Sequence, residues 1–391
     1  MNTEAKKSIC VVTGSRADYG LLRWTLAELA NDPFFELQLV VTGSHLRAEF
    51  GNTVEIIERD KFPIAERFDI LSEDNSPQGM ARSLGKAVLG FTDAFTRLSP
   101  DLVLLLGDRY EMLAAGETAL LLRLPIAHIH GGERTEGAVD EAVRHSLTKM
   151  AHLHFVSTEE YRKRVIQLGE PPSSVHFVGA LTLDCIAHAN LFDPDSLRSK
   201  LNFAWTDPLL LITLHSETLG NETSDAACDA LFDALNRIGP HSALFTASNA
   251  DAGGIRINER IMEYVQHRSH ARLIQSLGNE LYLGVMHASA AVVGNSSSGI
   301  FEAPLLGVPS VNIGDRQRGR LRSNSILDCP FRPQAIAEAI NRALSSDFSK
   351  AAKERRTPYG EGSPAKKIVE ILRNTDLSRL HMKEFYDLPH R

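Results

Sequence analysis

The sequence lacks the features of membrane and secreted proteins. No apolar run approaches the roughly 20 residues that a helix needs to cross a bilayer, and the first ten residues lead directly into a strand pattern without a signal peptide. Only four cysteines are present, and none forms a metal-type pair: Cys10, Cys185, Cys228 and Cys329. We therefore expect reduced thiols and a cytoplasmic protein.

Basic residues do not outnumber acidic ones. The chain has 42 lysines and arginines against 49 aspartates and glutamates, a formal net charge of -7. It lacks the excess positive charge by which proteins hold nucleic acid, so we expect no nucleic-acid partner. An anionic ligand would have to be held locally, by helix N-termini and a few arginines.

The chain does contain a repeated alternation of short apolar runs and amphipathic stretches. In the first half this pattern predicts parallel strands at Ile9–Thr13, Leu37–Thr42, Asp101–Leu106, Ile126–Ile129 and Leu153–Val156. It predicts helices at Leu21–Ala30, Gly79–Leu98, Glu111–Leu122, Ala138–Met150 and Glu159–Leu168. Such alternation is typical of an open parallel sheet that binds ligands beyond the carboxyl ends of its strands.

The pattern restarts after a breaker at Asp193-Pro194-Asp195. Here we expect strands at Leu209–Leu214, Ala243–Ala247, Ala291–Val293 and Ser310–Ile313, and helices at Ala226–Ile238, Asn258–Gln266, Leu281–Ala288, Gly299–Leu306 and Ala365–Arg373. A chain of 391 residues can fill two cores. We predict an α/β protein with two Rossmann-like domains, residues 1–190 and 191–360, that face each other across a ligand cleft, followed by a C-terminal segment, 361–391.

A glycine turn follows the first strand. The run TGSRADYG, residues 13–20, presents free backbone N–H groups, and Arg16 could add a forked pair of hydrogen bonds to a phosphate. The spacing is not the GxGxxG of dinucleotide sites. The alternative is a capped first turn with a solvated arginine.

A second glycine turn, GNSSSGIFE at residues 294–302, is richer in hydroxyl groups. Ser296, Ser297 and Ser298 at an expected helix N-terminus predict a cradle for a diphosphate. Glu302, about one turn later, could bind the two hydroxyls of a ribose. A serine-rich N-cap is the structural alternative. The basic loop GDRQRGR that ends at Arg320 could close over the site.

Two further motifs bring carboxyl groups to strand ends. In LGDRYE, Asp108 and Arg109 follow a strand, and Asp108 could also serve as an N-cap. The long motif HIHGGERTEGAVDEAVRH, residues 128–145, contributes Glu133, Asp140 and Arg144. Asp140 and Arg144 are i,i+4 on the expected helix and can pair. Several carboxyl groups in one cleft need not titrate alike, so one can act as base and another as acid.

The histidines of the long motif do not form a convincing metal site. His128 and His130 alternate on the expected strand and would point to opposite faces of the sheet. We therefore expect no metal. In the second half, His215 follows the strand at 209–214 and could donate to a sugar-phosphate oxygen. Asn249 and Asp251 follow the next strand and are candidate polar contacts, or residues of an Asx turn.

Taken together, the six motifs resemble the hydrolysing UDP-N-acetylglucosamine 2-epimerases of sialic acid synthesis. The resemblance runs from about Ile9 to about Arg320, with the motifs in the family's order. It implies the GT-B fold, with a C-terminal helix that crosses back to the first domain. It also implies a reaction in which a base removes the C2 proton, UDP leaves from C1, and water adds to the glycal-like intermediate. No cofactor is implied.

The resemblance assigns roles by position. Catalytic positions fall on Asp108, Asp140, Arg144 and His215, and UDP-binding positions on Arg16, Arg109, Asn249, Ser296, Ser297, Glu302 and Arg320, with Leu277 where relatives pack the uracil. Two positions depart from the pattern. His130 stands where several relatives have a catalytic glutamate, so that either Glu133 or His130 must make that proton transfer. Leu21 stands where several have a lysine.

These departures leave the sugar open. The alternative substrate is UDP-2,4-diacetamido-2,4,6-trideoxyglucose, which feeds legionaminic acid synthesis. A GT-B glycosyltransferase would leave the carboxylates of the long motif unexplained, and a non-catalytic UDP-sugar sensor would be expected to lose the carboxylates that are present here. The expected partners are the UDP-sugar, UDP and further copies of the chain in a homodimer or homotetramer.

Overall fold

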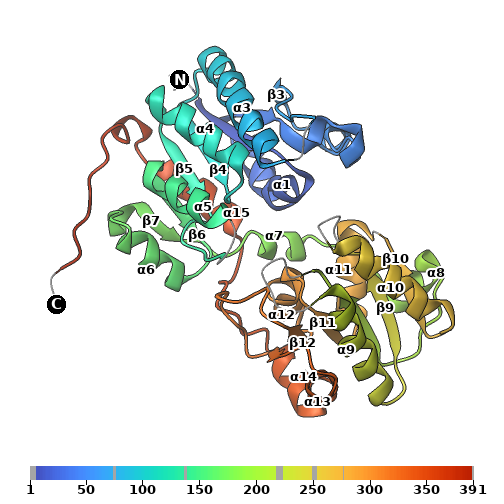
Figure 1. The fold of residues 1–391 in the computed structure, drawn as a ribbon. Coiled ribbons are helices and arrows are strands. Elements are labelled where there is room, and N and C mark those ends of the chain that lie inside the picture. The colour runs from blue at the N-terminus through green and yellow to red at the C-terminus, as the bar shows by residue number, and fades with distance from the viewer. Residues whose placement is uncertain are drawn as a thin grey trace. The chain divides into compact units, whose positions relative to one another are not determined.

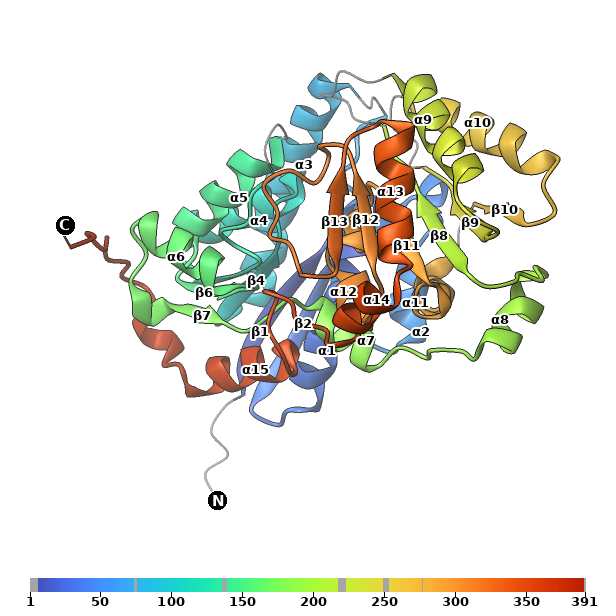
Figure 2. The same ribbon diagram turned by 90° about the horizontal axis from the view of Figure 1, so that it is seen from below.

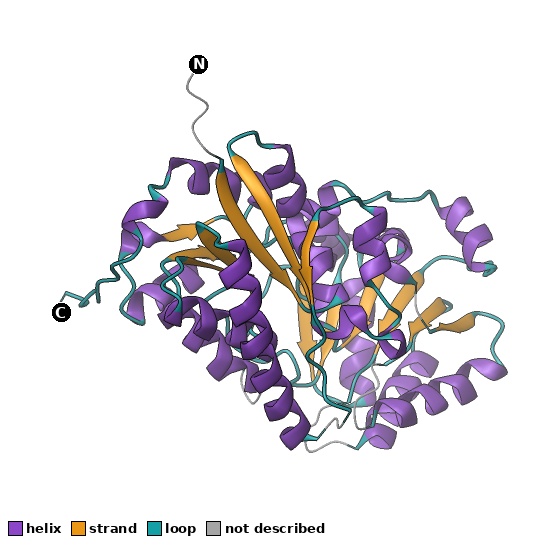
Figure 3. Ribbon diagram, turned by 90° about the horizontal axis from the view of Figure 1, so that it is seen from above, coloured by secondary structure: helices purple, strands orange, loops and turns teal. Residues whose placement is uncertain are grey.

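The chain divides into two compact units in a computed structural model that describes residues 6–73, 76–135, 139–216, 223–248, 253–275 and 277–389. Unit 1 comprises Met1–Cys185 and Tyr359–Arg391, and unit 2 comprises Ile186–Pro358 (Figure 1). Each unit contains an open parallel sheet with helices on both faces, as the alternating pattern predicts (Figure 3). No helix among the described residues has the length and apolar character needed to cross a membrane.

Unit 1 is built on a seven-stranded sheet in the order β3-β2-β1-β4-β5-β6-β7. Its strands are β1 Lys7–Thr13, β2 Phe35–Val41, β3 Ile64–Arg67, β4 Leu102–Leu106, β5 Ile126–Ile129, β6 Leu153–Val156 and β7 Val175–Phe177. Its helices are α1 Arg16–Asn31, α2 Val54–Arg59, α3 Pro77–Leu98, α4 Tyr110–Leu121, α5 Val139–Met150, α6 Glu159–Gln167 and α15 Pro364–Asn374, and α7 Thr182–Ala187 runs across the boundary between the units.

The central strands of unit 1 are buried on both faces, which explains their continuous apolar runs. Ile9 and Val11 of β1 pack into one core with α1 and α15. Cys10 and Val12, which point the other way, pack into a second core with α3, α4 and α5. The last helix of the chain, α15, therefore belongs to the first unit and contacts α1.

Unit 2 repeats this plan with a six-stranded sheet in the order β10-β9-β8-β11-β12-β13. Its strands are β8 Leu209–Thr213, β9 Ser242–Thr246, β10 Ala271–Ile274, β11 Ala291–Gly294, β12 Ser310–Ile313 and β13 Ile326–Cys329. Its helices are α8 Pro194–Leu201, α9 Ser224–Arg237, α10 Gly254–Gln266, α11 Gly278–Ala288, α12 Glu302–Leu306, α13 Pro333–Ala343 and α14 Ser346–Lys353. Figure 2 shows α13 against β12 and β13.

One predicted helix differs in the structure. The sequence predicts a helix from Gly299 to Leu306, but Ser297–Gly299 forms a single 3-10 turn and α12 begins at Glu302. Pro304 has no N–H to donate to the carbonyl group of Ile300, so a regular helix cannot include the preceding turn. Gly307, at a φ of 75°, ends the helix. The serines therefore lie in a turn before the helix, and Glu302 is its first residue.

The order of both sheets reverses at one point. In unit 1 the chain leaves β1 for β2 on one side and returns to β4 on the other, and in unit 2 β8 lies between β9 and β11 in the same way. Open parallel sheets bind ligands outside the strand ends at such a switch point. The loops after β1 and β4, and those after β8 and β11, are therefore the places to look for a site.

Candidate functional site

At the switch point of unit 1 the partly exposed Arg109 pairs with the buried Glu111. Arg109, the N-cap residue of α4, donates from Nε and Nη2 to the carboxylate of Glu111 at 2.9–3.3 Å. Glu111 is fully buried and lies against the loop that follows β1, where a Cβ on Gly14 would lie 3.2 Å from its Oε1. Glu111 thus fixes Arg109 beside the first glycine turn. Arg16 in that turn is exposed.

A second ion pair joins the end of β4 to α5. Arg144 on α5 is buried and pairs with Asp108. The i,i+4 spacing predicts Asp140 as a partner of Arg144, and it does not indicate Asp108, which lies 36 positions earlier in the chain. The fold brings the two together because β4 and β5 are neighbours and α5 follows β5. The pair ties the loop after β4 to α5.

Two other carboxyl groups near Arg109 behave differently. Burial raises the pKa of Asp140, and Arg109 opposes that effect only in part. Burial likewise raises the pKa of Asp18 on α1, whose Oδ2 atom is buried without a hydrogen-bond partner among the described residues. Both therefore hold a proton more readily than an ordinary aspartic acid. This edge of unit 1 combines the Asp108–Arg144 pair with carboxyl groups that favour protonation.

The long motif is arranged differently from the sequence prediction. β5 ends at Ile129, and His130 lies beyond it with a φ of 65°, so the two histidines do not alternate on one strand. Nε2 of His130 accepts a hydrogen bond from the backbone N–H of Leu181 at 3.4 Å, and its Nδ1 lies 3.6 Å from Oε1 of Glu133. Ser157 donates to the same Glu133 oxygen at 2.9 Å. Glu133 is thus buried and held between Ser157 and His130.

His128 has a structural environment. It is fully buried, and its Nε2 lies 2.7 Å from the carbonyl oxygen of Gly107, to which it donates. Burial lowers the pKa of His128 to about 3, so it is neutral at physiological pH. No group of three or more His, Cys, Asp or Glu side chains in the described part of the chain is arranged to hold a metal ion.

In unit 2 a single asparagine joins the loops after β8 and β11. Asn295 accepts from the backbone N–H of His215 at 2.7 Å and donates to its carbonyl oxygen at 2.8 Å. The loops approach so closely that a Cβ on Gly294 would lie 1.9 Å from the carbonyl oxygen of Thr213, so only glycine fits there. Nδ1 of His215 lies 3.2 Å from the hydroxyl of Ser248.

The serine turn is supported from α11. The Tyr282 hydroxyl lies 2.5 Å from the hydroxyl of Ser298, which lies 2.9 Å from that of Ser296. Ser296 also caps the turn by accepting from the backbone N–H of Ser298. Ser297 begins this 3-10 turn. Hydroxyl and amide groups thus gather at one strand end, as a phosphate site requires.

Glu302 lies next to this turn. Burial raises the pKa of its carboxyl group, which its own backbone N–H and the charge of Arg320 oppose. Its Oε2 atom is buried and lacks a hydrogen-bond partner among the described residues. Arg320 lies over the ring of Phe301 at 4.9 Å. A buried carboxyl oxygen without a donor is suited to a ligand that brings hydroxyl groups.

The structure groups most of the residues that the sequence singles out. Asp108, Arg109, Asp140 and Arg144 belong to one group in unit 1, and His215, Ser296, Ser298 and Glu302 lie at neighbouring strand ends in unit 2. Leu277 is buried and precedes α11. Leu21 packs against the core of unit 1. Asn249 and Asp251 lie outside the described residues.

Sequence reasoning assigned no role to four residues in these groups. They are Asp18, Glu111, Tyr282 and Asn295. Asp18, Glu111 and Asn295 stand within motifs that the sequence singles out, so their presence there was a usable signal. Tyr282 stands in an ordinary amphipathic helix, and no local pattern marks it.

Comparison with known proteins identifies the family of the chain. Residues 27–373 match the UDP-N-acetylglucosamine 2-epimerase family. The chain is 39% identical to GDP/UDP-N,N'-diacetylbacillosamine 2-epimerase (hydrolyzing) from Campylobacter jejuni, over 98% of this chain and 100% of the relative. It is 37% identical to polysialic acid biosynthesis protein P7 from Escherichia coli, over 98% of both chains.

A solved structure confirms the predicted fold class. UDP-GlcNAc 2-epimerase from Neisseria meningitidis, bound to UDP-GlcNAc, has a TM-score of 0.81 and 18% identity, with 94% of this chain and 100% of that chain covered. This likeness confirms an α/β protein of the GT-B type with two parallel sheets. Together with the match over residues 27–373, the curated relatives show that the chain belongs to the UDP-N-acetylglucosamine 2-epimerase family.

Proposed function

We propose that the chain is a hydrolysing 2-epimerase of a UDP-linked 2-acetamido sugar. The observation that carries this proposal is the group of unlike carboxyl groups in unit 1. Asp108 is paired with Arg144, whereas burial raises the pKa of Asp140 and of Asp18. A reaction that removes a proton from carbon and returns one from the other face needs a base and an acid in one site.

In this proposal unit 2 makes most of the contacts with UDP, Arg16 and Arg109 of unit 1 stand at further UDP-binding positions, and unit 1 carries out the proton transfers. The hydroxyl and amide groups of the Ser296–Ser298 turn and Arg320 bind the diphosphate, and Glu302 binds the ribose hydroxyls. His215 donates to the oxygen that leaves C1. Asp108 and Asp140 serve the transfers at C2, with Arg144 holding Asp108 in position. UDP leaves, and water adds to the intermediate.

We assign the remaining proton transfer to Glu133 and a supporting role to His130. Glu133 is the acidic residue nearest to His130, which stands at the position that the resemblance makes catalytic, and Ser157 donates a hydrogen bond to Glu133. His130 faces Glu133 with Nδ1 because its Nε2 accepts from the backbone of Leu181. A neutral imidazole with one nitrogen occupied as acceptor carries its proton on the other. The proton of His130 therefore faces Glu133 at 3.6 Å, and a small approach of the two side chains would form a hydrogen bond.

Two sugars are candidates for the substrate. The sequence resemblance indicates UDP-N-acetylglucosamine, which would give N-acetylmannosamine and UDP. The Campylobacter jejuni relative, 39% identical, is named for N,N'-diacetylbacillosamine, the 2,4-diacetamido-2,4,6-trideoxy sugar of the alternative. The name of that relative supports the second candidate, whereas the name of the 37% identical Escherichia coli relative, a polysialic acid biosynthesis protein, supports the first.

The decisive experiment supplies each UDP-sugar separately and identifies the sugar product by NMR. A hydrolysing epimerase releases UDP and a free 2-epimerised sugar with no acceptor present. Release of UDP only when an acceptor is added would indicate a glycosyltransferase. A UDP-linked epimer would indicate a non-hydrolysing enzyme, and tight binding of either UDP-sugar without any product would indicate a sensor.

A further inference from the structure

A buried polar cluster lies at the C-terminal end of α5, outside the candidate site. The Glu170 side chain is 1% exposed and accepts from Lys149 at 2.6 Å, from His154 at 3.0 Å and from Lys383 at 2.8 Å. Burial alone would raise the pKa of Glu170, but these three hydrogen bonds lower it to about 2. A buried carboxylate is stable only when its oxygens are paired in this way.

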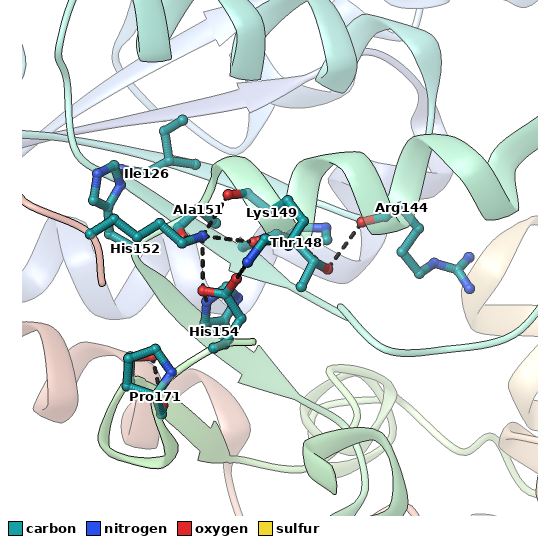
Figure 4. Close-up of polar contacts among 12 residues, drawn as sticks. Ile126, Arg144, Thr148, Lys149, Ala151, His152, His154 and Pro171 are labelled. Atoms are coloured by element: carbon teal, nitrogen blue, oxygen red, sulfur yellow. Dashed lines mark hydrogen bonds and ion pairs between the residues drawn. The ribbon is translucent and has the colours of Figure 1, made fainter. Parts of the chain in front are cut away.

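Lys383 of the C-terminal tail is the member of the cluster that comes from farthest along the chain. Its ammonium group donates to the carbonyl oxygens of Lys149 and Ala151 at 2.6 and 2.5 Å, in addition to Glu170. The last carbonyl groups of a helix have no donor within the helix. The three hydrogens of Lys383 thus meet acceptors at the end of α5 and on Glu170. Figure 4 shows Lys149 and Ala151 at this end of the helix.

Phe385 and Tyr386, which follow Lys383 closely in the tail, bind to the same part of unit 1. The backbone N–H of Tyr386 donates to the carbonyl oxygen of Gly169 at 2.9 Å. The ring of Phe385 covers Gly169 so closely that a Cβ there would lie 2.4 Å from it. The ammonium group of Lys149 lies 4.9 Å from the centre of the same ring. The contacts of Phe385 and Tyr386 with Lys149 and Gly169 therefore help to fix the position of Lys383.

This end of α5 is connected to the candidate site by a closed circuit of polar contacts. The Thr148 hydroxyl lies 3.0 Å from the carbonyl oxygen of Arg144 and 3.4 Å from Nδ1 of His128. His128 donates to the carbonyl oxygen of Gly107, the residue before Asp108. Asp108 in turn pairs with Arg144. In Figure 4 the guanidinium group of Arg144 points away from the cluster, on the same helix.

We propose that Lys383 is a positioning residue for the Asp108–Arg144 ion pair, acting through the last turn of α5. The tail fixes the end of the helix, and the helix fixes Arg144 one turn earlier. The consequence for turnover rests on the proposed function, whereas the consequence for the order of α5 does not. A displacement of a reacting group by about 1 Å can cost about 10²-fold in rate.

The test compares Lys383→Met with Lys86→Met. Lys86 is exposed on α3 and donates to a single backbone carbonyl group, so the control removes the same charge far from α5. Hydrogen exchange of residues 139–150 is measured by mass spectrometry, together with kcat for the UDP-sugar and the Kd for UDP. We expect faster exchange confined to α5, a kcat lowered roughly tenfold or more, and a Kd for UDP within about twofold of the wild type, because the serine turn and Glu302, which are assigned to the diphosphate and the ribose, belong to unit 2.

Phe385→Ala is a second variant in case Lys383→Met does not fold. Phe385 is 68% exposed, so its loss loosens the tail without opening the core, and we expect the same changes on a smaller scale. Unchanged exchange in α5, or faster exchange throughout the chain with parallel losses of kcat and UDP affinity, would overturn the proposal. A wild-type chain without turnover would contradict the proposed function, and exchange would still decide the role of Lys383.

Discussion

Glu302 carries a buried carboxyl group one of whose oxygens lacks a donor among the described residues. If ribose hydroxyls fill that place, Glu302→Ala should weaken UDP binding by roughly 1.5–3 kcal/mol, the range for hydrogen bonds to a charged group. Isothermal titration calorimetry measures this directly. An unchanged Kd would remove Glu302 from the nucleotide site.

Binding of UDP at Glu302 should also be linked to the release of protons. Burial raises the pKa of Glu302 in the free protein, and hydroxyl donors would lower it again when UDP binds. Binding should therefore release protons, and UDP affinity should increase as the pH rises through the raised pKa. Calorimetry in two buffers that differ in ionisation enthalpy counts these protons. Glu302→Gln, which cannot ionise, should release fewer protons than the wild type, because only the phosphate groups of UDP and other residues can then contribute.

Glu133 and His130 are distinguished by their variants. Glu133→Gln keeps the shape and the contact with Ser157 but removes the carboxylate, so kcat should fall by about 10²–10⁴-fold if Glu133 transfers a proton. His130→Ala should cost far less and leave the shape of the pH profile intact. A fully active Glu133→Gln beside an inactive His130→Ala would reverse the assignment and make His130 the group that transfers the proton.

Two buried histidines on strands β5 and β6 should make the stability of the fold depend on pH in acid. His128 on β5 and His154 on β6 are both fully buried, and burial lowers the pKa of each, to about 3 for His128. As the pH falls, both histidines therefore become protonated at a higher pH in the unfolded chain than in the folded one. The stability that each neutral imidazole contributes is complete above its unfolded pKa of about 6.5 and is lost as the pH falls towards the folded value.

Each of these histidines should add up to about 1.4 kcal/mol per pH unit to the acid dependence of the unfolding free energy below about pH 6.5. Thermal unfolding of the full chain between pH 7 and pH 5 measures this dependence. His128→Gln leaves a donor for Gly107 and removes one titrating group, so its slope should be shallower. His267→Gln, at an exposed position, is the control and should match the wild type.

The strands show which elements can be predicted from the sequence. All nine predicted strands exist, and the four that were missed, β3, β7, β10 and β13, are the outermost strands of the two sheets. Central strands are buried on both faces, so their sequences are continuous apolar runs. An edge strand such as β3, Ile-Ala-Glu-Arg, meets solvent and carries polar residues. Its pairing partner lies elsewhere in the chain, and a local pattern cannot reveal it.

For the whole molecule, motifs at strand ends indicate a site because parallel sheets collect those ends at one edge. This logic singled out Asp108, Arg144 and the serine turn. It could not find Lys383, which lies in a poorly patterned tail and meets Glu170 only after the chain has returned to unit 1. It also named only Asp140 as a partner of Arg144 and missed Asp108, since spacing along one helix says nothing about a neighbouring strand.

Variants in the two units should affect different constants, the Kd for UDP or kcat, if unit 2 makes most of the contacts with UDP and unit 1 transfers protons. Asp108→Asn should bind UDP like the wild type, because it changes no group assigned to the nucleotide, yet its kcat should fall by about 10²-fold or more. Glu302→Ala should weaken UDP binding instead. Calorimetry and steady-state kinetics on both variants provide the comparison.

Combining Asp108→Asn with Glu302→Ala in one variant tests whether the two residues act separately. Effects of distant residues with no shared partner add in free energy, usually to within about 0.5 kcal/mol. Asp108 is assigned no contact with the nucleotide, so the UDP affinity of the double variant should equal that of Glu302→Ala alone. A loss of UDP affinity in Asp108→Asn that equals its loss in turnover would contradict the division. It would mean that Asp108 contributes to holding the nucleotide rather than to the proton transfer.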